Sequence, residues 1–390
     1  MITKTVADTI SAALVDSGVK IVTCVPGAGG NEVFTGYNKL IQLQNPVSFH
    51  EETAYSLAHG ASLVGTRSAV LVKSHGIIKA GNSVTDSLFS GSHAGMLALV
   101  FTDKTGQHSD SILDIEPFLK GIGIPYQIAD MENIYQQVCR LMDLSEKMCL
   151  PQALVVESSD IQRVVSTESV QKWLGSGKVY QRDIVQRVLC PFFNQYQSAV
   201  LNCKNHNADW SLVPRPAIPR MPDCLTGSWK AQIENYAGLF SIFSRVRGPL
   251  VTGDTGISSL FAFEPYNCVD ITTYLGGSVP LAVGAYLGGC REVWAMTGDF
   301  AFIAAGHLGL LEAKQRQIPL KVLILYNGRS ATTGGQVIPE NSLETVLSGY
   351  QESLSYIHDP RNRDETETIL RKAQQSEKMS IVIADYRKLS

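Results

Sequence analysis

The sequence of 390 residues lacks the patterns that mark several common classes of protein. None of its eight cysteines forms a Cys-x-x-Cys pair, so neither an iron–sulfur cluster nor a structural zinc site is expected within this chain. No apolar stretch reaches the ~20 residues that a membrane-spanning helix needs. Lys and Arg are scattered along the chain and form no block. This distribution argues against a nucleic-acid surface.

The N-terminus also lacks the basic and then apolar order of a signal peptide, so a cytoplasmic location is expected. In that compartment the cysteines are expected to be small buried apolar residues. The formal net charge of -3 implies no polyanionic partner. A chain of this length can form two α/β domains.

Short apolar runs alternate with helical patterns, which predicts an α/β protein with two doubly wound, mainly parallel sheets. We expect domains at 1–160 and 214–390, joined by a linker with a helical segment at 161–213. The expected strands are 20–24, 46–49, 68–73, 96–102 and 154–157 in the first domain, and 249–252, 268–272, 293–297, 321–326 and 380–385 in the second. The expected helices include 4–17, 52–64, 78–91, 183–193 and 301–315.

An acid and an amide follow two consecutive strands of the second domain. Gly298-Asp299-Phe300 closes one strand, and Asn327-Gly328-Arg329 closes the next after a stretch of 26 residues (301–326). This is a βαβ unit whose ligand-binding edge carries two oxygen donors. Such oxygens suit Mg²⁺, which normally holds phosphates. The alternative is an ordinary Rossmann-like unit in which Asp299 and Asn327 only cap turns.

A second acidic site is expected in the first domain, where His50-Glu51-Glu52 begins the helix at 52–64. Acids at a helix N-terminus favour the helix dipole, which is the simpler interpretation of the pair. The small residues that follow Glu51 make a second interpretation necessary; they are Ala54, Ala58, Gly60 and Ala61.

These segments together resemble the thiamine diphosphate (ThDP) enzymes that act on 2-oxoacids. The pair at 298–300 and 327–329 is similar to their Gly-Asp-Gly…Asn signature, although Phe300 replaces the third glycine. The run from Arg329 to Gln336 resembles the indolepyruvate ferredoxin oxidoreductase α subunit. Sulfopyruvate decarboxylase has a similar Thr-Gly-Gly-Gln. The helix after Glu51 resembles the one that follows the catalytic glutamate of this family.

The resemblance implies roles for individual residues. Glu51 is the catalytic acid that hydrogen-bonds N1′ of the aminopyrimidine. Asp299 and Asn327 hold Mg²⁺ by side chain and Arg329 by backbone carbonyl. Leu275 supports the bent cofactor, in a segment that resembles the family's Met-Gly-Phe-Gly-Leu-Pro run. The expected cofactor-binding residues are Gly253, Asp254, Thr255, Leu275, Gly276, Gly298, Asp299, Phe300, Asn327 and Thr333, of which the first three belong to a Gly-Asp-Thr-Gly turn that can cradle phosphate.

Three functions compete. The favoured one is non-oxidative decarboxylation of a small anionic 2-oxoacid, similar to the sulfopyruvate and phosphonopyruvate decarboxylases, whose two domains match this chain in size. The second is the catalytic subunit of a 2-oxoacid:ferredoxin oxidoreductase of the indolepyruvate type. Because this chain shows no iron–sulfur domain, that function would need a separate electron-transfer subunit. The third is a non-catalytic ThDP-fold binding protein, which the presence of Glu51 argues against.

A decarboxylase needs groups that bind the substrate anion and deliver a proton. His75 is a candidate for proton delivery, because histidine titrates near neutrality. Lys73 and His108 are candidates for substrate binding. The simpler interpretations are a solvated strand end for Lys73 and a loop position for His108. The resemblance also implies a homodimer or homotetramer with interfacial active sites.

Overall fold

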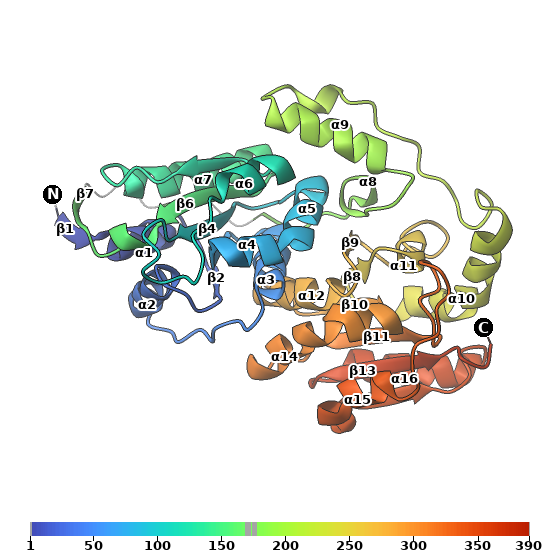
Figure 1. Ribbon diagram of the computed structural model, residues 1–390. Coiled ribbons are helices and arrows are strands. Elements are labelled where there is room, and N and C mark those ends of the chain that lie inside the picture. The colour runs from blue at the N-terminus through green and yellow to red at the C-terminus, as the bar shows by residue number, and fades with distance from the viewer. Residues whose placement is uncertain (1, 168–172, 174–177, 390) are drawn as a thin grey trace. The chain divides into compact units, whose positions relative to one another are not determined.

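The computed structural model describes residues 2–167, 173 and 178–389 (Figure 1). The chain divides into two compact units. The first comprises Met1–Tyr180, Asn202–Ala208 and Leu287–Gly289, and the second comprises Gln181–Leu201, Asp209–Tyr286 and Cys290–Ser390. The stretch expected as a linker, 161–213, is divided between the two units. Within it, 168–172 and 174–177 lie outside the described residues.

The first unit is built on a five-stranded parallel sheet in the order β2-β3-β4-β6-β5. Its strands are β2 (Ile21–Cys24), β3 (Ser68–Lys73), β4 (Met96–Thr102), β5 (Tyr126–Ile128) and β6 (Gln152–Glu157). All seven residues of β4 are buried, as expected for a central strand that is covered on both faces. A separate antiparallel pair joins β1 (Ile2–Thr5) to β7 (Val164–Thr167).

Helices cover both faces of this sheet, as the alternation of strand and helix requires. One core contains apolar residues of α1, α2 and α7 together with alternate residues of the strands. The helix α3 lies outside that core and is buried along almost its whole length. The helices of the unit are α1 (Val6–Asp16), α2 (Gly30–Ile41), α3 (Glu51–Leu63), α4 (Ser74–Lys79), α5 (Gly81–Ser90), α6 (Glu116–Ile122) and α7 (Ile134–Met148), followed by the 3₁₀ turn η1 (Ser158–Asp160).

The second unit is built on a six-stranded parallel sheet in the order β12-β13-β11-β10-β8-β9. Its strands are β8 (Leu250–Asp254), β9 (Ile271–Thr273), β10 (Val293–Gly298), β11 (Lys321–Tyr326), β12 (Leu354–Ile357) and β13 (Ser380–Asp385). The two central strands, β10 and β11, follow one another in the chain and pair directly.

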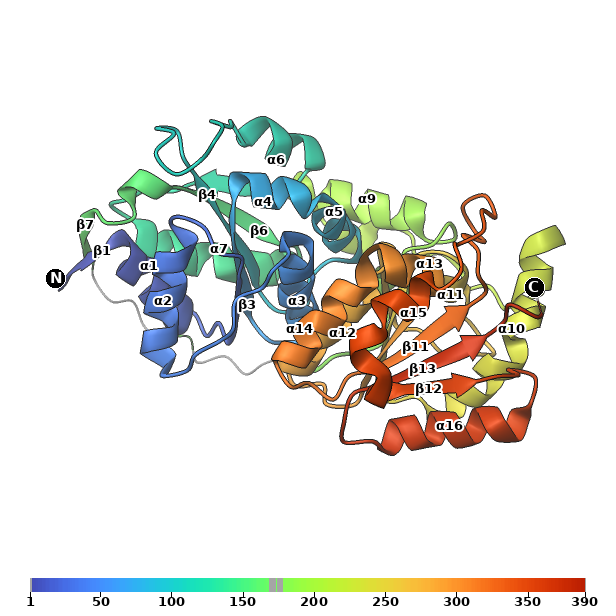
Figure 2. The same ribbon diagram turned by 60° about the horizontal axis from the view of Figure 1, so that its bottom comes forward.

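Two layers of helices also cover this sheet. The aromatic-rich core holds α10 and α16 against alternate strand residues, and Figure 2 shows α12 and α14 on the opposite face from α16. The elements are α8 (Ile184–Arg187), α9 (Asn194–Asn205), η2 (Trp210–Leu212), α10 (Gly227–Val246), α11 (Ile257–Leu260), α12 (Ser278–Leu287), α13 (Asp299–Ala301), the π-helical turn η3 (Phe302–Gly306), α14 (His307–Gln315), α15 (Ser342–Val346), η4 (Ser348–Ser353) and α16 (Arg363–Gln375).

The structure confirms the predicted fold class and the strands at 68–73, 96–102, 321–326 and 380–385. The predicted strand at 46–49 is wrong, because the structure has irregular backbone there, although the N–H of Ser48 donates to the backbone oxygen of Cys24 at the end of β2. The helix predicted at 78–91 is two helices, α4 and α5, that meet at Ala80. The helix predicted at 183–193 is limited to α8, because Pro191 cannot continue it.

Among the described residues, no helix combines the length and the apolar character that crossing a membrane would require.

Candidate functional site

The site in the second unit is formed where three neighbouring parallel strands end. In the sheet, β10 lies between β8 and β11, with Met296 beside Gly253 and Gly298 beside Leu325. Asp254 ends β8, Asp299 follows β10 and Asn327 follows β11. Ligands bind in α/β sheets at this carboxyl edge. The topology therefore brings both predicted metal-binding side chains to one place.

Asp299 is a buried acid whose two oxygens accept hydrogen bonds from the backbone. Its Oδ1 accepts from the N–H of Phe300 at 2.9 Å, and its Oδ2 accepts from the N–H of Gly328 at 2.7 Å. Burial raises the pKa of Asp299 to about 6, although these hydrogen bonds act in the opposite direction. Among the described residues, Asp299 forms no ion pair with a basic side chain. A cation at this position would favour its ionised form.

The side chain of Asn327 is held at both of its polar atoms. Its Oδ1 accepts from the N–H of Arg329 at 2.9 Å, and its Nδ2 donates to the hydroxyl of Tyr236 at 3.2 Å. A carbonyl oxygen has two lone pairs, so Oδ1 can still bind a cation. Asp299 and Asn327 thus fit a hard divalent ion that prefers oxygen ligands.

A pocket surrounds these side chains. Its lining includes nine of the predicted residues and several that follow them in the chain. The predicted residues on its wall are Asp254, Thr255, Leu275, Gly298, Asp299, Phe300, Asn327, Arg329 and Thr333. Phe300, the residue in place of the family's third glycine, is 43% exposed on this wall.

Two predicted residues, Gly253 and Gly276, do not line this pocket, and packing accounts for their being glycines. A Cβ atom at Gly253 would lie 2.9 Å from Val269. Gly276 has a φ of +87°, and a Cβ atom there would lie 2.6 Å from both Ala301 O and Gly306 N. The backbone of Gly276 therefore touches the π-helical turn that begins three residues after Asp299. π-helical turns often occur at functional sites.

Asp254 joins the elements around the pocket. Its Oδ1 accepts from the N–H of Ser278 at the start of α12, and its Oδ2 accepts from the hydroxyl of Thr297 at 2.5 Å. Burial raises the pKa of Asp254 to about 6. Its carboxylate therefore fixes β8, β10 and α12 relative to one another.

The segment after Asn327 folds back on itself and carries part of the pocket wall. The backbone N–H of Ser330 donates to Gln336 O at 2.9 Å, and the Ser330 hydroxyl donates to Gln336 Oε1 at 2.6 Å. Gly334 and Gly335 take positive φ angles within this loop, which favour glycine. The Thr-Gly-Gly-Gln run thus makes the turn that presents Thr333 to the pocket.

In the first unit, Glu51 is the first residue of α3 and forms an ion pair with Lys79. The distance from Lys79 Nζ to Glu51 Oε2 is 2.9 Å, and the Glu51 side chain is 19% exposed. A Cβ atom at Gly76 would lie 2.8 Å from Glu51 Cγ. Gly76 therefore leaves the space that this side chain occupies.

Glu52 has a different environment from its neighbour. It is buried, and burial raises its pKa, while a hydrogen bond with Asn82 and the charge of Lys79 oppose that rise. The two acids at this helix start are thus not equivalent. Glu51 forms an ion pair with Lys79 of α4, whereas the Glu52 side chain is buried.

The candidates Lys73, His75 and His108 come together at one loop. Lys73 Nζ donates to the backbone oxygen of His108 at 2.7 Å and to Ser109 Oγ at 2.5 Å. His75 Nε2 lies 2.8 Å from Ser111 Oγ. These contacts hold the loop after β4 against the end of β3. For His108, the Lys73 contact uses its backbone and not its ring.

Asp103 organises the same loop from inside. It accepts from the N–H groups of Gln107 and His108 and from the hydroxyl of Thr105. Burial alone raises the pKa of Asp103, but these hydrogen bonds outweigh it and lower the pKa to about 2. The loop is therefore built around an ionised carboxylate.

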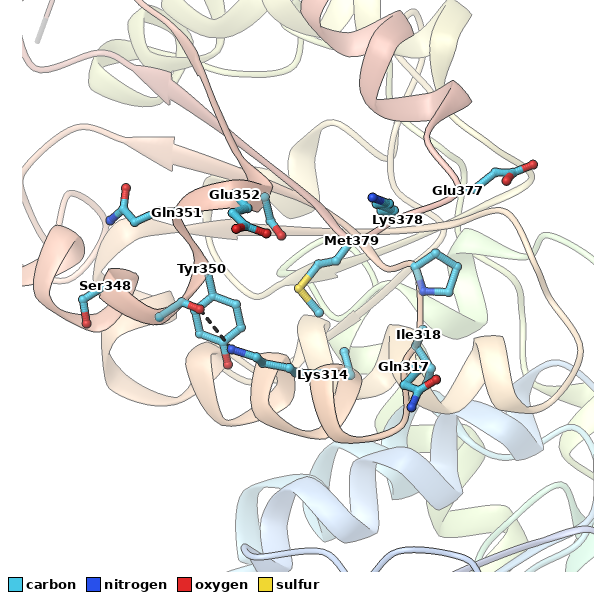
Figure 3. Close-up of a pocket in the computed structure, with 14 residues that line it drawn as sticks. Lys314, Gln317, Ile318, Ser348, Tyr350, Gln351, Glu352, Glu377, Lys378 and Met379 are labelled. Atoms are coloured by element: carbon cyan, nitrogen blue, oxygen red, sulfur yellow. Dashed lines mark hydrogen bonds between the residues drawn. The ribbon is translucent and has the colours of Figure 1, made fainter.

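A second cavity, of about 610 Å³, lies at the opposite, amino-terminal edge of the second sheet (Figure 3). Lys314 spans it by donating to Gly349 O at 3.0 Å, with its Nζ 4.9 Å from the centre of the Tyr350 ring. The charged side chains around it, such as Glu377 and Lys378, are exposed. It contains none of the predicted site residues.

Sequence reasoning missed Tyr236 and Lys79, which contact Asn327 and Glu51 respectively. Tyr236 lies in the middle of α10, far from any motif, so no sequence signal marks it. Lys79 lies within a short helical pattern after His75. Its ion pair with Glu51 depends on how the two helices pack, which the sequence does not show. In the described part of the chain, no three His, Cys, Asp or Glu side chains form a metal cluster.

Part of the second unit matches the model of a known protein family. Residues 254–383 match the model of the thiamine pyrophosphate enzyme C-terminal TPP binding domain. The second unit is therefore similar to a TPP binding domain over this range, which agrees with the resemblance seen in the sequence. The matched range contains all of the Gly-Asp-Thr-Gly turn except Gly253, as well as Asp299 and Asn327.

Two curated relatives are both described as indolepyruvate oxidoreductase subunit IorA. The protein from Methanothermobacter marburgensis is 23% identical over 222 residues, which are 53% of this chain and 34% of that protein. The protein from Methanothermobacter thermautotrophicus is 27% identical over 143 residues, which are 36% of this chain and 23% of that protein. The chain thus spans about a third or less of the length of these relatives.

Solved structures share the fold at low identity. A thiamine diphosphate-dependent 4-hydroxybenzoylformate decarboxylase from Rhodococcus jostii has a TM-score of 0.69 and 14% identity, covering 98% of this chain and 99% of its own. Benzoylformate decarboxylase from Polynucleobacter necessarius has a TM-score of 0.66 and 10% identity, covering 98% of both chains. The likeness concerns the fold.

Proposed function

We propose that the protein is a ThDP- and Mg²⁺-dependent enzyme that decarboxylates a small anionic 2-oxoacid without an external oxidant. The observation that supports this most is the pocket at the carboxyl edge of β8, β10 and β11. There, buried Asp299 and the oriented amide of Asn327 lie within the part of the chain that matches a TPP binding domain. When bound, the cofactor supplies the electron sink for breaking the bond to the carboxylate.

Each predicted site residue of the second unit has a defined role in this proposal. Asp299 and Asn327 would hold Mg²⁺ through side-chain oxygens, and Arg329 would hold it through its backbone carbonyl. Asp254 and Thr255, together with Gly298 and Thr333, would surround the diphosphate, while Leu275 and Phe300 would contact the body of the cofactor and Gly253 would support the turn by its packing on Val269. Gly276 supports them by packing on the π-helical turn.

The first unit supplies the acid and the substrate-binding groups. Glu51 would hydrogen-bond the aminopyrimidine, and positioning of this contact would replace a strong protein base. His75, whose Nε2 lies 2.8 Å from Ser111 Oγ, would supply the proton that the product needs once CO₂ is released. Lys73 and His108 attract the substrate anion, with Lys73 also holding the loop that carries His108.

The second candidate function is that of an oxidoreductase, and the similarity to the IorA subunits favours it. The identity to the IorA subunits suggests the catalytic part of a 2-oxoacid oxidoreductase, which would pass electrons to a separate subunit. A non-catalytic ThDP-binding protein is a third candidate, and the position of Glu51 beside Gly76 is an argument against it.

One experiment separates these candidates. The purified protein is incubated with Mg²⁺, ThDP and a panel of 2-oxoacids that includes sulfonated and phosphonated ones, with and without an artificial electron acceptor. We expect CO₂ and aldehyde without the acceptor. Production of CO₂ only with the acceptor supports the oxidoreductase, and cofactor binding without turnover of any oxoacid supports the binding protein.

The proposed assembly is a homodimer or a homotetramer. Light scattering coupled to size-exclusion chromatography measures its mass directly, and a monomer that is fully active would contradict it.

A further inference from the structure

The orientation of the Asn327 amide can be assigned from its two partners. The backbone N–H of Arg329 can only donate a hydrogen bond, so the amide atom 2.9 Å from it must be the oxygen. The nitrogen then faces the Tyr236 hydroxyl at 3.2 Å and donates to it. The N–H of Arg329 therefore distinguishes the two ends of this amide, and the Tyr236 hydroxyl, which can donate or accept, gives the nitrogen its acceptor.

Tyr236 is itself held firmly. It projects from α10, is 5% exposed and packs edge-on against Tyr386, with ring centres 4.4 Å apart. It also contacts Phe261 edge-on. A buried ring in such a cluster cannot easily follow a moving partner. Its hydroxyl is therefore a fixed acceptor on the wall of the pocket.

We propose that Tyr236 is a positioning residue for the cation site, acting through Asn327. By accepting from Nδ2, it acts together with the N–H of Arg329 to hold Oδ1 at the 327–329 turn, in the pocket that Asp299 also lines, where a hard cation needs an oxygen. Without the hydroxyl, the amide nitrogen would lose its acceptor and the amide could rotate. This inference rests on the proposed Mg²⁺–ThDP function and identifies an outer residue of that same site.

Tyr236→Phe tests the proposal, because it removes only the hydroxyl and keeps the ring packing. Tyr386→Phe is the matched control, since it removes a hydroxyl from the neighbouring ring, which does not line the pocket. Mg²⁺ binding to the full chain with saturating ThDP is measured by calorimetry. We expect about a 10-fold loss of Mg²⁺ affinity in Tyr236→Phe, as for other outer partners of metal ligands, and no loss in Tyr386→Phe.

Two further measurements make the outcome specific. Thermal unfolding of the cofactor-free variants shows whether Tyr236→Phe folds like the wild type. In an Asn327→Ala background, Tyr236→Phe should have no additional effect, because a residue acting through Asn327 has nothing left to position. An unchanged Mg²⁺ affinity in Tyr236→Phe, or an equal loss in both tyrosine variants, would overturn the proposal.

The failure of this inference can be told apart from failure of the proposed function. If the wild type binds no Mg²⁺ with ThDP, the proposed function itself fails. If the wild type binds and Tyr236→Phe binds equally well, only the role of Tyr236 fails.

Discussion

Asp299 and Gly328 are joined by a hydrogen bond of 2.7 Å, in which the backbone N–H of Gly328 donates to Asp299 Oδ2. The two residues follow neighbouring strands, β10 and β11, and are separated by a helical crossover. This bond connects the acid of the first motif to the turn of the second. The cation site that we propose is therefore partly ordered before any ligand binds.

Replacing Asp299 with alanine should remove Mg²⁺-dependent binding of ThDP. Of the three predicted metal ligands, Asp299 is the one that has a carboxylate. The loss should exceed the roughly 10–100-fold effect of removing an outer partner. Calorimetry with Mg²⁺ and ThDP measures it. Asp364→Ala, an exposed acid in the first turn of α16, is the control and should bind normally. Unchanged cofactor affinity in Asp299→Ala would rule out the metal assignment.

Replacing Glu51 with glutamine should lower turnover by at least about 100-fold, the smaller end of what proton-transfer groups contribute, while ThDP still binds. Glu52→Gln is the matched control on the same helix turn, and it should retain activity because Glu52 is buried and paired with Asn82. Steady-state rates and ThDP titrations check both variants. If Glu51→Gln keeps normal activity, or Glu52→Gln loses it instead, Glu51 is not the catalytic acid.

Gly76→Ala should displace Glu51, because the new Cβ atom would lie 2.8 Å from Glu51 Cγ. Overpacking of this kind costs about 1–3 kcal/mol, and turnover should fall together with stability. In Gly81→Ala the nearest atom of the surroundings is a Phe118 carbon at 3.9 Å, so this control should behave like the wild type. Equal activity of the two variants would mean that the space beside Glu51 is unimportant.

The buried carboxyl of Asp254 should make stability depend on pH. Its pKa is raised from 3.8 to about 6 in the folded protein, so the folded state binds the proton more tightly than the unfolded state. Its contribution is fully present below pH 3.8 and is lost as the pH rises through 6.

Asp254→Asn remains uncharged and can still accept from Ser278, while the Thr297 hydroxyl can rotate to accept from the amide. Relative to the wild type, we expect this variant to gain about 2–3 kcal/mol between pH 4 and pH 7. Denaturant unfolding of the cofactor-free protein at both pH values measures the difference. A stability difference that is the same at pH 4 and pH 7 would contradict the assignment.

Asp270 is completely buried and forms ion pairs with Arg182 and Arg247. It also accepts from the backbone N–H of Val251. Asp270→Asn should destabilise the protein by about 3–5 kcal/mol, because two guanidinium groups lose their shared anion. Arg182 is 35% exposed, so Arg182→Gln should cost much less. Equal losses in the two variants would indicate that burial of Asp270 is not the cause.

The sequence determined much of the sheet framework. Continuous apolar runs such as those of β4 and β11 identify strands buried on both faces, and the residues that follow strands in parallel sheets must meet at one edge. For that reason Asp299 and Asn327 could be brought together from their positions in the chain. The segment at 46–49 was misjudged, because an extended run looks the same whether or not a partner strand lies beside it.

Only the tertiary structure decided which side chains support these residues. Tyr236 reaches Asn327 from a helix that starts 100 residues earlier in the chain (227–327), and Lys79 reaches Glu51 across two helices. The structure also showed that Lys73 Nζ donates hydrogen bonds to a loop and that Gly76 leaves space for the Glu51 side chain. Contacts between distant segments depend on packing distances of a few ångströms, which leave no periodic signal in the sequence.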